Sequence, residues 1–180
     1  MSDQTDISLA FELEDITLLE CVYHAEAPIQ GRELDRRLLV QNPGKRFSLD
    51  VKRRKNVLRA NVSVQFGLFD RKEKVNIPDA GLQPLEVVHF GLVAGVVVTA
   101  PIMGGEAIAP RHLAGDKTPE AHRDEKMERG MRVEAIKAAY GLATSKLLEL
   151  SAMSPIGSIM LPLIDTDEIF DDIVRNETEV

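Results

Sequence analysis

The residues best suited to acid–base or metal chemistry are the four histidines, His24, His89, His112 and His122. None has a partner at a metal-ligand spacing such as His-Glu-x-x-His, and the sequence has no Cys-x-x-Cys pair. His89 lies in an apolar stretch and is predicted to be a hydrogen-bonded core histidine. His122 and Glu125 could share one face of a predicted helix, but Asp124 and Glu128 beside them are more typical of a solvated charged face.

Cys21 is the only candidate for cysteine chemistry. A nucleophilic thiolate needs a base or a positive environment, whereas Cys21 lies between Glu20 and Val22, so we expect a small strand residue. The glycines form neither a Gly-x-Gly-x-x-Gly fingerprint nor a Walker loop. These patterns predict a protein that is not an enzyme and that uses no metal or other cofactor.

The charge balance argues against a nucleic-acid binder, because the net charge is −7. The exception is a basic cluster in the first third of the chain, comprising Lys45, Arg46, Lys52, Arg53, Arg54 and Lys55. This cluster is typical of a solvated hairpin turn, and the alternative is a docking patch for an acidic partner. A lone cysteine, an acidic N-terminus and the lack of an apolar run long enough to cross a bilayer favour a cytoplasmic protein without membrane insertion.

Strand patterning covers three stretches, residues 7–27, 46–69 and 85–100. In the first, the alternation of apolar and polar residues slips at Asp15, which predicts a β-bulge or a break into two strands. The second is typical of a hairpin with its turn near residues 52–56. The third is apolar on both parities and rich in valine, which predicts a strand covered on both faces, by a helix and by a neighbouring subunit.

Three stretches punctuated by proline or glycine are predicted to connect the regular elements: a linker over residues 28–45, a polar loop over 70–84 and an irregular segment over 101–118. Each contains turn-forming residues and too little apolar periodicity for a long helix or strand. We therefore expect the strands to lie in the first part of the chain and to be joined by surface connections.

Helical patterning begins after these strands. Apolar residues at spacings of three and four predict a helix over residues 119–152, with a break near Gly130 as an alternative. A shorter helix follows over residues 165–173, capped by Asp165 or Thr166. The pattern predicts one α+β domain over residues 1–180, with frayed ends at 1–5 and 175–180.

Two segments resemble the SecB-type chaperone family. The segment FELEDITLLECVYHAEAP, residues 11–28, looks like that family's first strand, which is phase-slipped and ends in Ala-Pro. The segment SIMLPLIDTDEIF, residues 158–170, is similar to its apolar, proline-bearing loop and short terminal helix. The chain departs from the family in a longer connection over residues 101–130 and in the basic turn over 52–55.

The resemblance implies a four-stranded antiparallel sheet with the long helix and the short terminal helix packed on one face. It also implies a homo-oligomer, a dimer or a tetramer, that holds unfolded or extended polypeptides in an apolar groove without ATP. Delivery of the held polypeptide to a translocase or another partner would complete this role.

Candidate site residues follow from the resemblance and from the apolar pattern. The client groove would be lined by Phe66, Leu68, Leu147, Ile156, Ile159, Met160, Leu161 and Leu163. The first strand offers acidic residues for docking a partner, namely Glu12, Glu14, Glu20 and Glu26. A Leu161→Asp change is then expected to weaken client binding without unfolding the protein, whereas unfolding would place the loop in the core.

Two other functions remain open at this point. The chain could be a structural or assembly subunit that uses the strand 85–100 and the helix 119–152 as an oligomer interface, because that strand is apolar on both faces. It could also be an enzyme that uses His122 with Glu125. A fixed partner without affinity for unfolded polypeptides would favour the assembly subunit.

Overall fold

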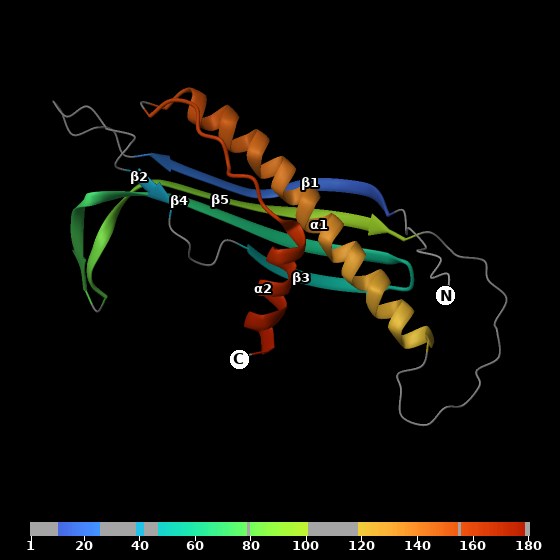
Figure 1. Ribbon diagram of the computed structural model, residues 1–180. Coiled ribbons are helices and arrows are strands. Elements are labelled where there is room, and N and C mark those ends of the chain that lie inside the picture. Colours follow the sequence, from blue (N-terminus) through green and yellow to red (C-terminus); the bar gives the residue numbers. More distant parts are fainter. Residues whose placement is uncertain are drawn as a thin grey trace, which may run out of the picture.

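The fold combines an antiparallel sheet with two helices on one of its faces (Figure 1). The computed structural model describes residues 11–25, 39–41, 47–78, 80–100, 119–154 and 156–178. Within these ranges the sheet has five strands, so the predicted α+β class is confirmed and the predicted count of four strands is one too low.

The strands are β1 (Glu12–Ala25), β2 (Leu39–Gln41), β3 (Phe47–Arg54), β4 (Val57–Ile77) and β5 (Gly81–Thr99). β5 pairs with β1 on one side and with β4 on the other, and every pairing is antiparallel. β3 pairs with the first part of β4, and β2 pairs with Leu68–Asp70 farther along the same edge. The sheet is therefore four strands wide, because two short strands share its fourth position.

The slip of apolar–polar alternation in the first strand corresponds to an irregular pairing between β1 and β5. The β1–β5 register shifts between Leu13 and Asp15, and again between Leu18 and Glu20. Each extra residue lets the strand keep its apolar side chains on the side of the sheet that faces the helices. The predicted bulge is confirmed, and a second one accompanies it.

Two predicted connections contain strand structure instead. The polar loop over 70–84 is the end of a hairpin, because β4 continues to Ile77 and β5 starts at Gly81, whose φ is +73°. The predicted linker contains β2. The described side chains from Lys74 to Pro84 are exposed, so this arm is paired through its backbone and has no core face. Hydrophobic alternation cannot signal such a strand.

The core lies between the sheet and α1 (Pro119–Ala152), which crosses β4, β5 and β1 diagonally (Figure 1). One row of α1 at four-residue spacing is fully buried, comprising Met131, Ala135, Ala139, Ala143, Leu147 and Ser151. Three alanines in this row let the helix backbone approach the sheet closely. The buried partners of this row are the even-numbered residues of β5 from Val88 to Val98, followed by Ala100 just after the strand.

Gly130 does not break α1, which runs without interruption through this position. A Cβ atom at Gly130 would overlap the ring of Phe11, so the glycine makes room for that ring just before β1. The second helix, α2 (Thr166–Thr178), is capped by Asp165, whose Oδ1 accepts the backbone N–H groups of Asp167 and Glu168. α2 extends beyond the predicted end at residue 173, so residues 175–178 are helical rather than frayed.

Candidate functional site

The connecting segment, residues 156–165, joins α1 to α2 and runs back along α1 (Figure 1). Two polar contacts hold it there. The backbone N–H of Ile159 donates to Ser151 Oγ at 2.7 Å, and the Tyr140 hydroxyl donates to the carbonyl oxygen of Pro162. Because Ser151 is fully buried, its hydroxyl satisfies a backbone group that would otherwise lie unpaired beside the core.

The apolar residues of the connecting segment divide into an inner and an outer set. Ile156, Ile159 and Leu161 are buried in the core. Met160 and Leu163 point outward, with exposed fractions of 69% and 102%. Burial of the inner set anchors the segment, and the outer set then presents large apolar side chains to solvent from an anchored backbone.

Further exposed apolar residues lie at the end of α1 that precedes the connecting segment. Met153 is 94% exposed, and Leu148 and Leu150 are also exposed. Methionine side chains are flexible and polarizable, which suits contact with varied apolar partners. Apolar spacings of three and four along α1 do not separate Leu148 and Leu150 from the core residues, whereas the buried row follows four-residue spacing and includes neither.

The predicted client-groove residues therefore have different environments. Phe66 and Leu147 belong to the core together with the inner set, and Leu68 is half-buried against it. Within the described protomer only Met160 and Leu163 of the eight predicted residues are open to a ligand. Since Leu161 is a core residue, a Leu161→Asp change probes folding and is not a clean probe of binding.

The predicted docking carboxylates lie on β1. Glu12, Glu14 and Glu20 are exposed there, while Glu26 lies outside the described residues. Glu14 sits at the first bulge and its Oε1 accepts a hydrogen bond from the Thr99 hydroxyl. The strand thus presents acidic side chains at the edge of the sheet.

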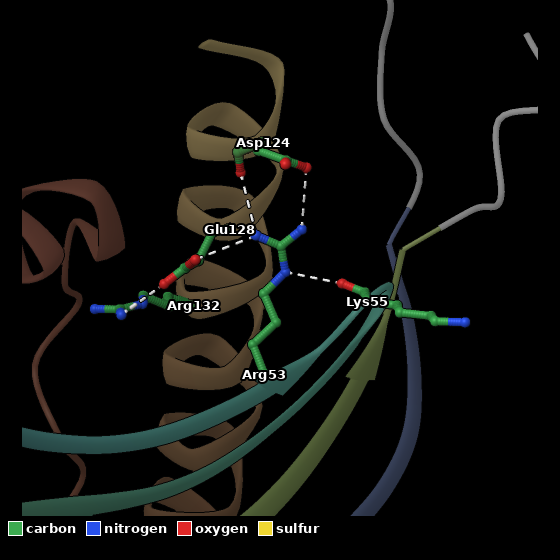
Figure 2. A network of polar contacts seen from close by, with 5 residues as sticks. All are labelled: Arg53, Lys55, Asp124, Glu128 and Arg132. Atoms are coloured by element: carbon green, nitrogen blue, oxygen red, sulfur yellow. Dashed lines mark hydrogen bonds and ion pairs between the residues drawn. The ribbon is translucent and has the colours of Figure 1, made fainter. Parts of the chain in front are cut away.

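Strand alternation splits the basic cluster of the β3–β4 hairpin between the two faces of the sheet. The turn is Lys55–Asn56, with φ of +54° at Lys55, so residues 52–54 are still strand. Arg53 points toward α1 and donates to Glu128 Oε2 at 3.2 Å and to Asp124 Oδ1 at 3.3 Å. Figure 2 shows how this guanidinium also reaches the carbonyl oxygen of Lys55. The network ties the hairpin tip to the first half of α1.

The histidines and the cysteine are placed as follows. His89 is not in the core; its side chain is 43% exposed and its Nδ1 lies 3.1 Å from Glu86 Oε1. His24 is its exposed cross-strand neighbour. The side chain of His122 and all of His112 lie outside the described part of the chain. Burial raises the pKa of the Cys21 thiol while Lys146 opposes the shift, so the thiol is a weak nucleophile.

The described residues contain neither a metal cluster nor a membrane-spanning helix. Across the described ranges, no three His, Cys, Asp or Glu side chains come together as a metal site would require. Neither described helix combines the length and the hydropathy needed to cross a bilayer.

No protein-family model matches this sequence, and no curated protein matches it. Among solved structures, the chain is similar to a SecB-like chaperone of Mycobacterium tuberculosis, determined in complex with a ChAD peptide from the HigA1 antitoxin. The two share 13% sequence identity with a TM-score of 0.48, over 86% of this chain and 90% of the other. The function of this chain therefore has to rest on its own residues.

Proposed function

We propose that this protein is an ATP-independent chaperone that holds unfolded or extended polypeptides on an apolar surface beside α1. The observation that carries the proposal is the outward set of the connecting segment, Met160 and Leu163, together with Met153 at the end of α1. Each is at least two-thirds exposed on a backbone that Ser151 and Tyr140 hold in place. Large apolar side chains on an anchored segment are a favourable place for an apolar ligand to bind.

The chemistry of such a ligand follows from the surface. Met and Leu side chains offer dispersion contacts and apolar burial without directional hydrogen bonds, so they select apolar side chains and not one sequence. An unfolded polypeptide exposes many such side chains in extended segments. Holding it needs neither a nucleotide nor a covalent step, so the protein acts by binding and not as an enzyme.

Handover of the client to a translocase or another partner belongs to this proposal. Its docking candidates are Glu12, Glu14 and Glu20 on β1, with Glu26 beyond the described residues. The cytoplasm, where unfolded chains emerge before export, is the expected compartment. Assembly as a dimer or tetramer would multiply the apolar surface available to one long client.

The test compares a double change at the outward set with a matched control. Met160→Asp with Leu163→Asp places charges where the client would lie, and Leu82→Asp alters a residue of similar exposure, 68%, on the distant hairpin arm. Binding of a reduced, unfolded client is followed by size-exclusion chromatography with light scattering, without nucleotide. We expect about tenfold weaker binding for the double variant and native binding for the control.

Two outcomes would count against this proposal. Equal client binding by the native protein and the double variant would remove the connecting segment as the site. Equal loss in the Leu82→Asp control would mean that any exposed apolar residue contributes. Both variants alter exposed side chains, so thermal unfolding should stay near that of the native protein, and this check separates lost binding from lost structure.

The assembly subunit is the second candidate, favoured by the half-buried outer side of β5. Within the protomer, α1 covers the inner side of β5, so the interface proposed for residues 85–100 would use the outer side. A protein that ignores unfolded clients but keeps a fixed stoichiometric partner would favour this function over the chaperone.

A further inference from the structure

The open face of the sheet, which is the side turned away from α1 and α2, is divided lengthwise into two halves. The pairing registers fix this division, because directly opposed residues of antiparallel strands share a face. The half formed by β5 and β1 carries apolar residues, with Val93 and Val97 half-buried and Val22 exposed. The half formed by β3 and the first part of β4, the polar strip, includes Asp50, Lys52, Arg54, Arg59, Asn61 and Ser63.

The cations of the polar strip are not neutralised within the described protomer. Lys52 lies directly opposite Arg59, and like charges in that position destabilise a strand pair. Neither of them, nor Arg54, forms an ion pair with any residue in the described ranges. Arg53, which lies between them in the sequence, points to the opposite face and is paired with two carboxylates of α1 (Figure 2). The three remaining cations are therefore open to a negative group from another molecule.

These cations surround a hollow at the hairpin end of the polar strip. It has a volume of about 510 Å³, and the described residues that line it are Lys52, Arg54, Val57 and Arg59. Charges of one sign that converge on a hollow attract a ligand of the opposite sign more strongly than scattered surface charges do. Two of the three are arginines, whose planar guanidinium can bind one carboxylate through two parallel hydrogen bonds. The hollow therefore suits a ligand with more than one acidic group.

The spacing of the cations matches the repeat of an extended polypeptide. Lys52 and Arg54 are two residues apart on β3, so their Cα atoms are separated by about 6.6 Å along the strand. An extended segment repeats the side chains of one face at the same distance. Carboxylates at alternate positions would thus meet Lys52 and Arg54 in turn, with Arg59 beside the first. Farther along β3, Asp50 would repel a third carboxylate, whereas Asn61 opposite it can hydrogen-bond to neutral groups.

We propose that the polar strip is a docking site for an extended acidic segment of another protein, with aspartate or glutamate at alternate positions. The segment lies along β3 and β4 on the open face, and its carboxylates enter the hollow and bind Lys52, Arg54 and Arg59. This site has the opposite charge to the carboxylates of β1 and takes a different partner. It lies on the face of the sheet away from the connecting segment, so it does not depend on client binding at Met160 and Leu163.

A short acidic peptide fits this half of the face better than a nucleic acid does. Proteins hold single-stranded nucleic acids by aromatic stacking as well as by cations, and no open-face position of β3 or of its β4 partners is aromatic. A long polyanion that crossed the sheet would also meet carboxylates on β1, about 14 Å away. Asp15 lies in the same cross-strand row as Lys52, and Glu12 in the same row as Arg54. These carboxylates favour a ligand that stays on β3 and β4.

Binding of a labelled peptide tests the proposal. The probe is a short peptide in which glutamate alternates with serine, and its binding is followed by fluorescence anisotropy at low salt. Lys52→Glu with Arg54→Glu should weaken binding by at least about tenfold, because the hollow then repels the carboxylates. The same peptide with glutamine in place of glutamate should bind the native protein equally weakly. Added salt should weaken binding of the glutamate peptide, since the charged groups are exposed.

Controls separate a local effect from a change in net charge. Reversal of two exposed cations elsewhere, Lys74→Glu with Lys137→Glu, changes the net charge by the same amount and should leave peptide binding unchanged. If the reversal variant misfolds, as seen by circular dichroism, Lys52→Gln with Arg54→Gln replaces it and should weaken binding by a smaller factor. Folded variants should still bind an unfolded client, so a failure of this site and a failure of the chaperone function are separate results.

Several results would overturn the proposal. They are equal binding of the glutamate and glutamine peptides, unchanged binding by the folded reversal variant, and an equal loss in the Lys74→Glu, Lys137→Glu control. A peptide of the same composition with its glutamates in one block should bind more weakly, and equal affinity would contradict the extended register over Lys52 and Arg54. A protein that ignores the peptide but binds polyphosphate through these residues would also overturn it and would assign the hollow to phosphate groups.

Discussion

The two faces of β5 belong to one strand but have different environments. On the inner face the even-numbered residues from Val88 to Ala100 are almost completely buried under α1. On the outer face the odd-numbered residues from His89 to Thr99 are only half-buried, and the cover there includes the Leu19 side chain of neighbouring β1, which lies beside Gly95. One side of β5 is thus buried in the core of the protomer, and its other side is only half-buried.

This difference explains how a strand can be apolar on both parities in a protomer that covers only one of its faces. The sequence predicts two covers, a helix and a neighbouring subunit. α1 supplies the first, and the second, a neighbouring subunit, is the interface that the assembly candidate would use. Three comparisons of paired variants, and one comparison of acid dependence, test how the covered parts of the molecule differ from the exposed parts.

The largest expected effect separates the two faces of β5 directly. Leu92→Ala should lower the free energy of unfolding by about 2–5 kcal/mol, because Leu92 is buried under α1 and the change leaves a cavity. Val93→Ala, one residue along and on the outer face, should cost less than about 1 kcal/mol in a dilute protein. Urea unfolding followed by circular dichroism measures both.

The dependence of unfolding on protein concentration gives a second test of the Leu92→Ala and Val93→Ala pair. If a second copy covers the outer face, the cost of Val93→Ala should grow with protein concentration, because the dimer stabilises the folded state by mass action. A large cost for Val93→Ala in the most dilute samples would contradict the contrast between the two faces.

The next comparison concerns two glycines of α1, of which one contacts another side chain and the other lies in open space. Gly130→Ala should destabilise the protein by about 1–3 kcal/mol, because the added methyl group displaces the ring of Phe11. Gly141→Ala should stabilise it by about 1 kcal/mol, since nothing lies within 4 Å of its Cβ position and alanine favours a helix. Thermal unfolding of the two variants gives shifts of opposite sign, and equal signs would mean that Phe11 does not pack on the helix.

Sequence alone predicted the elements that have a core face. The slip of alternation near Asp15 located a bulge, because a half-buried strand must keep its apolar residues on one side. The helix after Pro119 was predicted with its observed bounds, because its apolar stripe repeats over many turns. In both cases, burial of one face makes apolar residues recur at a fixed spacing along the sequence.

The remaining features lack such a period. The hairpin arm around Gly81 is exposed on both sides, so its strand structure depends on backbone pairing that side chains do not report. In the connecting segment, Ile159 to Leu163 are all apolar apart from a proline, and composition does not separate Leu161 inside from Leu163 outside. That division depends on where Ser151 and Tyr140 fix the backbone, which is tertiary information.

A smaller effect is expected from two neighbouring cations on opposite faces of β3. Arg53→Met removes the ion pairs with Asp124 and Glu128 that hold the hairpin tip to α1, and should cost about 1 kcal/mol because these groups are partly exposed. Lys52→Met should be neutral or slightly stabilising in the monomer, because it removes a like-charge contact with Arg59. Thermal unfolding at low protein concentration measures both, and an equal loss for Lys52→Met would contradict the assignment of these side chains to different faces.

The smallest effect concerns the ion pairs that fasten α2 to α1 on the covered side. The Arg129 guanidinium, which bonds to Asp171, holds the pKa of that carboxyl below its ordinary range. A carboxyl whose pKa is depressed by folding contributes stability above its unfolded pKa and loses it as the pH falls through its folded pKa. The melting temperature should therefore decrease below about pH 4, the unfolded range of an aspartate.

In Asp171→Asn this part of the acid dependence should disappear, and an unchanged acid profile would show that the pair does not fasten α2. Because both groups are largely exposed, solvent screens the pair and the change should be the weakest of the four.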